Sequence, residues 1–299
     1  MNFFCAYCSP AGSTRRIAGI IEQELQQLGC DLSSLDLGKT RYWRPFIDKI
    51  RSAAEADGAC LFVGSPVYVF HAVPPVLRFI ESLPSVPAGV AVPFVTWGCV
   101  TSGVALWEMG KMLIEKGFGL AAAAKVLSVH SRLWQSQHPI GEGHPDKADD
   151  AVVIGLIRSV FNNLVAGNTQ SLSLGELDYQ PHEHRGRMMR TSIKTDPRKI
   201  PPRKVLKDKC TRCADCQLGC PADAIELSPY PVFGEACFGC FNCVRLCPEK
   251  AIETDLSGRK AGLLESMATF NEEALTRAFL PSVLNSHSPK TLAKSVNPF

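Results

Sequence analysis

Short apolar runs alternate with stretches of helical periodicity over the first 167 residues of the chain. The apolar runs predict buried strands at residues 2–7, 59–63, 89–96 and 120–129, and we place a further strand at residues 31–37, which have no such run. Amphipathic patterns between and after these runs predict helices, at residues 13–28, 45–56, 74–82, 102–116 and 146–165. Strands that alternate with helices are typical of a parallel sheet covered on both faces. The sequence therefore predicts the α/β class, with a doubly wound, five-stranded parallel sheet.

Three loops follow three of these strands and should meet at one edge of the sheet, where ligands of open α/β folds bind. The first loop, residues 9–14, reads SPAGST, and its small residues let backbone N–H groups approach an anion at a helix N-terminus. It contains no Lys, unlike a nucleoside-triphosphate loop. The loops at residues 64–71 and 97–103 offer aromatic side chains and backbone amides that suit a flat polar ring. Each loop alone is also consistent with a helix cap or with packing at the domain rim.

The second half of the chain holds two cysteine runs with the same spacing, C-x2-C-x2-C-x3-C-P. The first run is Cys210, Cys213, Cys216 and Cys220, and the second is Cys237, Cys240, Cys243 and Cys247. This spacing holds two [4Fe–4S] clusters, and the fourth cysteine of each run ligates the cluster of the other run. We therefore expect one cluster on Cys210, Cys213, Cys216 and Cys247, and the other on Cys237, Cys240, Cys243 and Cys220.

Zinc and disulfides are the alternative readings of these cysteines. Structural zinc sites usually take two separated C-x2-C pairs, whereas each run here places three cysteines in a row. Disulfides need an oxidising compartment, and the N-terminus has no evident signal-peptide pattern. The other five cysteines have no metal-ligand spacing and are expected to pack as small apolar residues; they are Cys5, Cys8, Cys30, Cys60 and Cys99.

Residues 203–254 resemble the bacterial-type dicluster ferredoxins, and the first half of the chain resembles a flavodoxin. The segments GSPVY…PP and TWG…SG are similar to those of flavodoxin–ferredoxin fusion proteins of anaerobic bacteria and archaea. This resemblance implies a flavodoxin-like FMN domain joined to a small α+β dicluster ferredoxin domain. By position it assigns the phosphate to Ser9, Ala11, Gly12, Ser13 and Thr14, and the flavin ring to Pro66, Val67, Tyr68, Trp97, Gly98 and Cys99. The first loop departs from the common pattern, because Pro10 removes a backbone donor and Ala11 replaces a hydroxylated residue.

The 299 residues leave room for more than one domain. We expect a flavodoxin-like domain at 1–167, a Pro-containing linker at 168–204, the ferredoxin domain at 205–255 and a helical extension with a frayed tail at 256–299. The net charge is only +3, but residues 180–209 hold ten Lys or Arg against three acidic residues. This basic run can steer an acidic redox partner, such as a small ferredoxin or an acceptor enzyme, or can simply be solvated.

The sequence also indicates what the protein does not do. No recognised nucleic-acid motif accompanies the basic run, and no apolar stretch reaches the length of a membrane span. No G-x-G-x-x-G follows a strand, so direct oxidation of a nicotinamide cofactor is not expected. Clusters together with free thiols predict a reducing cytoplasm.

Together these features predict an electron-transfer protein that relays electrons between two [4Fe–4S] clusters and FMN, to or from a redox partner protein. The alternatives are a cluster-fed flavin reductase, acting on a quinone or an enzyme-bound cofactor, and a non-catalytic interaction module that uses the basic run. A flavin site capped by aromatic side chains beside an exposed cluster edge would favour the carrier. Space above the ring would favour the reductase. Transfer within one chain and transfer across a homodimer are both open at this stage.

Overall fold

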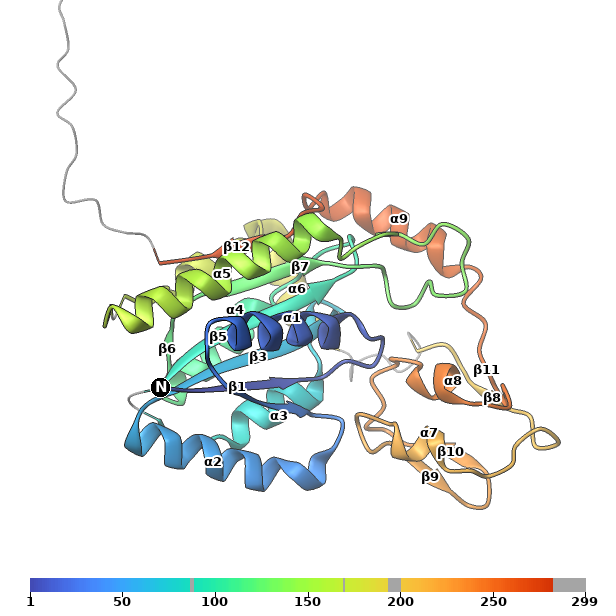
Figure 1. Ribbon diagram of the computed structural model, residues 1–299. Coiled ribbons are helices and arrows are strands. Elements are labelled where there is room, and N and C mark those ends of the chain that lie inside the picture. The colour runs from blue at the N-terminus through green and yellow to red at the C-terminus, as the bar shows by residue number, and fades with distance from the viewer. Residues whose placement is uncertain (87–88, 169, 193–199, 282–299) are drawn as a thin grey trace, which may run out of the picture.

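The computed structural model describes residues 1–86, 89–168, 170–192 and 200–281. Its centre is a sheet whose five long parallel strands follow the order β2-β1-β3-β5-β7 (Figure 1). These strands are β1 (Asn2–Tyr7), β2 (Leu32–Asp36), β3 (Ala59–Tyr68), β5 (Val90–Trp97) and β7 (Ala123–Leu127). Counted among themselves they run 2-1-3-4-5, which is the flavodoxin-like order of doubly wound sheets. The predicted α/β class and flavodoxin-like parallel sheet are therefore confirmed.

Alternating side chains of the central strands face two separate cores, one on each side of the sheet. On β1, Phe3 and Cys5 pack in one core, and Phe4 and Ala6 pack in the other. Helices α1 (Ser13–Gln27) and α5 (Lys147–Val165) cover the first face. The second face is covered by α2 (Trp43–Ala56), α3 (Pro74–Ser82) and α4 (Ala105–Glu115). Burial on both faces explains why β1, β3 and β5 have near-continuous apolar sequences.

The strand β3 continues five residues beyond the apolar run that predicted it. Ser65 and Pro66 still pair with β5, opposite Val95 and Thr96. The chain then reverses at Val69 and Phe70, which have φ values of 48° and 75°, and returns as β4 (His71–Ala72). This reversal places the second predicted loop directly over the end of the sheet. The remaining short elements are β6 (Gly119–Leu120) and the 3₁₀ turn η1 (Thr40–Tyr42).

The segment between the two halves is ordered along much of its described length. It contains the 3₁₀ turn η2 (Leu174–Leu177) and the helix α6 (His182–Arg190). Met188 is fully buried, and its carbonyl lies 3.1 Å from His71 Nε2. Arg185 of the basic run pairs with Asp178. Residues 193–199, with the basic Lys194, Arg198 and Lys199, lie outside the described residues.

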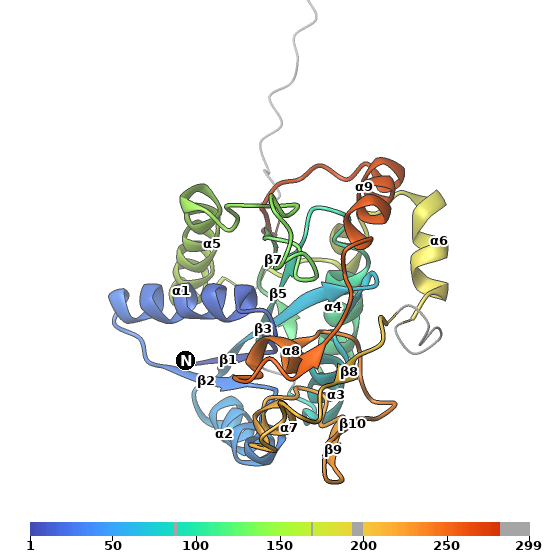
Figure 2. The same cartoon turned by 90° about the vertical axis from the view of Figure 1, so that its right-hand side faces the viewer.

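Residues 200–256 form a small unit, called here the cysteine lobe, beside the carboxyl ends of the parallel strands (Figures 1 and 2). Its two halves repeat with an offset of 27 residues, and matching positions share left-handed backbone: Arg212 with Gly239, Ala214 with Phe241, and Asp223 with Lys250. Two antiparallel strand pairs join the halves, β8 (Lys204–Val205) with β11 (Ile252–Glu253), and β9 (Ile225–Leu227) with β10 (Pro231–Phe233). Each half has one short helix, α7 (Asp215–Leu218) or α8 (Asn242–Leu246).

The C-terminal extension returns to the first half of the chain. Its first part is the helix α9 (Arg259–Phe270), as the periodicity predicted. The predicted helical extension is not helical throughout, because Arg277–Phe279 form the strand β12. This strand pairs antiparallel with the edge strand β7, and the ring of Phe279 stacks on Tyr179 at 5.2 Å. Residues 282–299, which include the predicted frayed end, lie outside the described residues. Within the described chain, no helix combines the length and apolar character needed to cross a bilayer.

Candidate functional site

The three predicted loops meet around one cavity at the carboxyl ends of β1, β3 and β5. The cavity has a volume of about 220 Å³, below the roughly 300–1000 Å³ typical of small-molecule sites, and its mouth is open to solvent. Eight of the residues assigned from sequence line it: Ser9, Ala11, Ser13, Thr14, Pro66, Val67, Tyr68 and Gly98. The cavity therefore lies where open α/β sheets bind their ligands.

The first loop has the features of an anion site at a helix N-terminus. Gly12 precedes α1 with a φ of 97°, a conformation that suits glycine, and an added Cβ would meet nothing within 4 Å. Ser9 Oγ accepts a hydrogen bond from Arg15 N at 2.8 Å, so this hydroxyl also caps the helix. Thr14 Oγ1 lies 2.9 Å from Thr96 Oγ1 in a buried pair. The remaining first-turn N–H groups have no intrahelical acceptor and can receive an anion.

Tyr68 presents an unpaired polar group in this cavity. Its hydroxyl is buried and forms no hydrogen bond of ordinary geometry within the described chain, although the side chain of Ser131 is close enough to lower its pKa. Burial raises the pKa of Tyr68, and the nearby Cys240 raises it further, so the hydroxyl keeps its proton and can donate it. Buried polar groups normally find a partner, so this orphan fits a bound polar ligand.

Glycines let the third loop approach its neighbours closely. A Cβ on Gly98 would lie 2.8 Å from the Cα of His130. A Cβ on Gly103, where φ is 58°, would lie 2.1 Å from the carbonyl oxygen of Phe70. Both contacts are shorter than real Cβ atoms make, so larger residues at these two positions would push the cavity walls apart.

Three residues assigned from sequence lie outside the lining of the cavity. Trp97 is 1% exposed and packs with Leu127 and Leu133, under the ammonium group of Lys125. Cys99 packs in the same cluster with a φ of 63°. Gly12 faces a neighbouring groove instead of the main cavity.

Other lining residues were not assigned individually from the sequence, although Val69, Phe70, Val100 and Thr101 belong to the predicted loops. These other residues are Val69, Phe70, Thr96, Val100 and Thr101, the loop 128–132 after β7, Arg187 on α6, and Leu263, Ser266 and Phe270 on α9. The loop after β7 follows a parallel strand at the same sheet edge as the three predicted loops. Its position in the predicted topology could therefore have identified it as part of the site. Burial lowers the pKa of His130 in this loop to about 4, with Arg132 adding to the effect, so its ring is neutral at pH 7.

His71 should make the docking of α6 at this cavity pH-dependent. Burial lowers its pKa, but Glu108 and the carbonyls of Thr191 and Met188 outweigh this, and the net shift is upward. A raised folded pKa means that the stabilisation is fully present below the unfolded pKa, about 6.5, and is lost as pH rises through the folded pKa. We expect amide exchange in residues 182–192 to accelerate over that interval. The variant His71→Gln should show no such step; a step that persists in it would contradict the assignment.

Four cysteines line a further small cavity, of about 20 Å³, in the cysteine lobe. They are Cys210, Cys213, Cys216 and Cys247, called here the outer cysteine group, and the side chain of Cys213 is exposed. Ala251 N donates to Cys247 Sγ at 3.2 Å. This set joins three members of the first sequence run with the last member of the second.

The other four cysteines lie between the outer group and the sheet. They are Cys220, Cys237, Cys240 and Cys243, called here the inner cysteine group, and they lie within electrostatic range of one another. Ala224 N donates to Cys220 Sγ at 3.3 Å, and Gly239 N donates to Cys237 Sγ at 3.4 Å. Burial raises the pKa of Cys240 to about 12, so a thiolate at this position requires a positively charged partner. This donor set fits a cationic metal centre.

The inner cysteine group and the first cavity share a wall. Tyr68 lines the cavity, and its ring packs edge-on against Phe238 at 5.6 Å. Tyr68, Phe238 and three cysteines of the inner group belong to one continuous buried cluster. Arg245 fixes the arrangement by donating to the carbonyl oxygens of Cys240 and Ser131.

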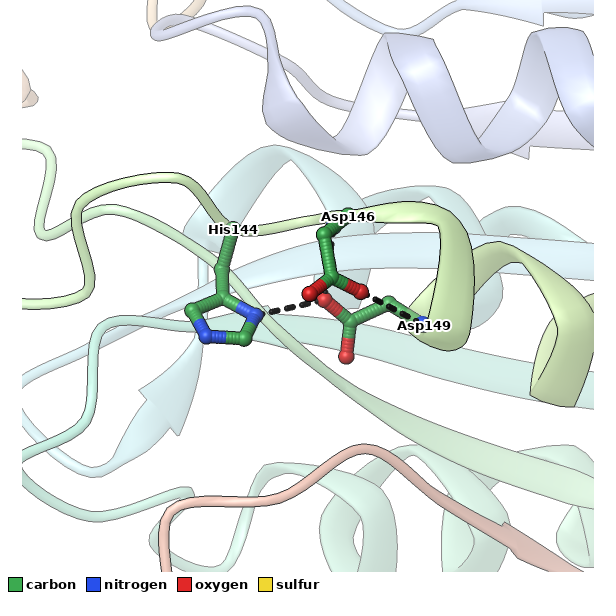
Figure 3. A group of neighbouring side chains, drawn as sticks. All are labelled: His144, Asp146 and Asp149. Atoms are coloured by element: carbon green, nitrogen blue, oxygen red, sulfur yellow. Dashed lines mark hydrogen bonds and ion pairs between the residues drawn. The ribbon is translucent and has the colours of Figure 1, made fainter.

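A separate group of side chains, His144, Asp146 and Asp149, brings three ligand atoms within 4.8 Å (Figure 3). Asp146 Oδ1 accepts from the backbone N–H groups of Ala148 and Asp149 at the start of α5. Asp149 Oδ2 accepts from Asp146 N at 2.7 Å and lies 2.6 Å from His144 Nδ1. The contacts between Asp146 and Asp149 form a capping box at the start of α5. The three side chains are therefore explained by helix capping, without a bound metal.

Comparison with known proteins gives structural neighbours only. No protein-family model and no curated protein matches the sequence. Similar solved structures include rubredoxin oxygen:oxidoreductase from the anaerobe Desulfovibrio gigas, with 19% identity and a TM-score of 0.44 over 55% of this chain. A flavodoxin from the domain Archaea gives 16% identity and a TM-score of 0.42, covering 55% of this chain and 99% of its own. This chain spans only 36% of the length of the D. gigas protein. The flavodoxin-like fold is evident from the strand order itself.

Proposed function

We propose that this protein is an electron-transfer flavo-iron–sulfur protein. In this proposal it relays electrons between two [4Fe–4S] clusters and FMN, to or from a redox partner protein. The observation that carries the proposal is the shared wall: Tyr68 lines the cavity at the sheet edge and packs on Phe238 of the cysteine lobe. Redox centres on the two sides of this wall would be neighbours in a single chain.

FMN is the ligand whose chemistry suits the first cavity. The first-turn N–H groups of α1, with Ser9, Ser13 and Thr14, would hold its phosphate through dipoles and hydroxyls. Pro66, Val67, Tyr68 and Gly98 would contact its ring, and the orphan hydroxyl of Tyr68 would donate to a polar edge. When bound, FMN supplies the ability to accept electrons singly or in pairs. The residues of the chain position the ring and exclude water from one side of it.

The outer and inner cysteine groups would hold the two clusters, each with three cysteines from one run and one from the other. The backbone donors at Ala224, Gly239 and Ala251 reach the sulfurs that iron would bind. Hydrogen bonds of this kind tune cluster potentials. Cys216 and Cys243 are within electrostatic range of each other, so in this proposal the two clusters and the flavin would lie in series.

The exposed Cys213 favours a partner protein at the outer end of this series. A partner must approach the terminal centre, and the outer group is the one that reaches the surface. Part of the basic run has other roles in the fold, since Arg185 pairs with Asp178 and Arg187 lines the cavity. We propose an acidic redox protein as partner, steered by the exposed lysines at 204, 207 and 209.

A flavin reductase acting on a small molecule is the second candidate. The cavity extends beyond the three flavin loops to Arg187, Leu263 and Phe270, which belong to segments outside the parallel sheet and its covering helices. In this candidate, these residues would border the space in which a small acceptor binds beside the ring. Reduction of a quinone by the anaerobically purified protein, saturable in quinone, would favour this candidate.

The test of the proposal is anaerobic purification followed by iron, acid-labile sulfide and flavin assays. Two [4Fe–4S] clusters predict about eight irons per chain, with one FMN. Eight irons with no flavin, even after FMN is added, would limit the protein to an elaborated ferredoxin. Flavin without iron would remove the relay.

Replacing the last cysteine of the first run tests whether each cluster takes one ligand from the other run. Cys220→Ala removes a proposed inner ligand, so we expect iron to fall to about half, or about four per chain. Cys60→Ala, a buried cysteine on β3, should leave the iron content unchanged. Iron that stays at the wild-type value in Cys220→Ala would contradict the assignment.

A further inference from the structure

Three arginines surround the inner cysteine group. Arg203 Nη1 donates to Cys237 Sγ at 3.1 Å. The guanidinium of Arg132 lies 5.8 Å from the ring of Phe241 and 5.9 Å from that of Tyr68, within electrostatic range of Cys240 and Cys237. Arg245 Nη1 donates to the carbonyl oxygen of Cys240 at 2.9 Å. All three arginines are partly buried.

The half-buried carboxylate that shares a groove with Arg245 is Asp36, and it is already paired with Arg15 at 2.7 Å. Within the described residues, no carboxylate forms an ion pair with Arg132, Arg203 or Arg245. Asp223 lies near Cys220, but it is exposed and already accepts from Thr40 Oγ1 at 3.2 Å. The Nε of Arg203 is buried without a partner, so this side chain is held by its sulfur contact and by the face of Phe233, 4.0 Å away.

The outer cysteine group has a different environment. The charged residues at its cavity are Arg212 and Glu249, one of each sign, and both are exposed. The exposed Lys209 lies beside Cys210 in sequence, and the exposed Lys250 lies three positions after Cys247. Water and salt screen such charges, whereas a partly buried cation a few ångströms away acts with much less screening. The charge difference that screening does not remove is therefore due to the three partly buried arginines at the inner group.

One-electron reduction adds one negative charge to a centre, and a nearby fixed cation stabilises the reduced form. Burial of the inner group opposes reduction, because it removes water from the more highly charged state. Direct donation from Arg203 to a ligand sulfur, with two further guanidinium groups at the same site, acts against that cost. Net charge and hydrogen bonds to sulfur are the quantities that set cluster potentials.

We infer that Arg132, Arg203 and Arg245 make the inner centre the higher-potential one of the two, so that electrons enter at the exposed outer centre and pass inward toward the flavin cavity. This inference rests on the proposed function. The step is the transfer of one electron, which oxidises the outer centre and reduces the inner one, and no bond forms or breaks. The reductant is a low-potential one-electron donor, for which dithionite stands in during the test.

The test is a potentiometric titration of the intact protein followed by electron paramagnetic resonance of the reduced clusters. Cys213→Ser identifies the outer signal, because it alters an outer ligand only. In the wild type we expect the inner signal to appear first on reduction. Arg203→Gln should shift the inner midpoint to lower potential and leave the outer midpoint in place, while Arg203→Lys should restore part of the shift.

Arg212→Gln is the matched control, since it removes an exposed arginine beside the outer group. It should leave the inner midpoint unchanged. If both clusters are present, an outer signal that appears first would overturn the inference, and so would an inner midpoint that Arg203→Gln leaves unchanged. Iron well below eight per chain in the wild type would instead refute the proposed function, and the inference with it.

Discussion

Replacement of Glu272 by Ala is expected to destabilise the protein by about 3–5 kcal/mol, the cost of leaving a buried charge unpaired. Glu272 Oε1 lies 2.6 Å from Lys125 Nζ, and the two side chains are only 11% and 6% exposed. The carboxylate also accepts from Thr101 Oγ1, from Ser102 N and from Gln180 Nε2, at 2.7, 2.8 and 3.0 Å. Without this carboxylate, the Lys125 ammonium would be buried without an anionic partner, and the segment between α9 and β12 would lose the contacts that hold it on the sheet.

Chemical denaturation measures this loss, and Glu273→Ala is its neighbouring control. Glu273 is exposed, so its replacement should change the free energy of unfolding by no more than about 0.5 kcal/mol. Because α9 supplies Phe270 to the cavity wall, Glu272→Ala should also weaken FMN binding. Equal stability of the two variants would show that the network does not hold the extension in place.

The same carboxylate gives the stability a pH dependence. Burial raises the pKa of Glu272, but the charge of Lys125 and the hydrogen bonds from Lys125, Ser102 and Gln180 outweigh it, so the net pKa is lowered. A lowered folded pKa contributes stability above the unfolded value, about 4.3, that is lost as pH falls through the folded pKa. Glu272→Ala should remove this part of the acid unfolding.

Periodicity and spacing predicted the features that depend on local sequence. Strands buried on both faces appear as apolar runs, so four of the five parallel strands were clear. Loops at strand ends share one sheet edge, and this topology brought Ser9, Tyr68 and Gly98 to one cavity. Trp97 could not be placed in the same way, since strand alternation decides whether such a side chain faces a ligand or a core, and here it joins a core.

Features that depend on partners far away in sequence escaped prediction. The strand β12 forms because the edge of β7 is open and Glu272 is anchored beside it, and three residues of strand sequence carry no signal of their own. The same holds for Arg187 and Phe270, which reach the cavity only because α6 and α9 fold back over it. The contact between the cysteine lobe and the sheet is a further case, because neither half of the sequence indicates which surface meets the other.

Replacement of Arg245 by Met is expected to loosen that contact and to slow electron exchange between the two halves. Arg245 Nη1 donates to the carbonyl oxygen of Cys240 at 2.9 Å, and Nη2 donates to that of Ser131 on the loop after β7. The guanidinium also stacks on Trp134 at 4.2 Å. Hydrogen bonds to a charged group contribute about 1.5–3 kcal/mol each, and Met fills the space of the stem but replaces neither bond.

Amide exchange in residues 128–137 and the rate of flavin reduction after rapid mixing with dithionite measure the two effects. We expect faster exchange and a slower cluster-dependent phase in Arg245→Met, with the iron content unchanged because no ligand is lost. Arg15→Met is the control: this arginine forms an ion pair with Asp36 in which its own side chain is 60% exposed, and such pairs contribute about 0–1 kcal/mol. Arg245 joins Cys240 to the loop at the cavity. An unchanged reduction rate in Arg245→Met would therefore mean that the contact between Tyr68 and Phe238 is sufficient to hold the two halves together.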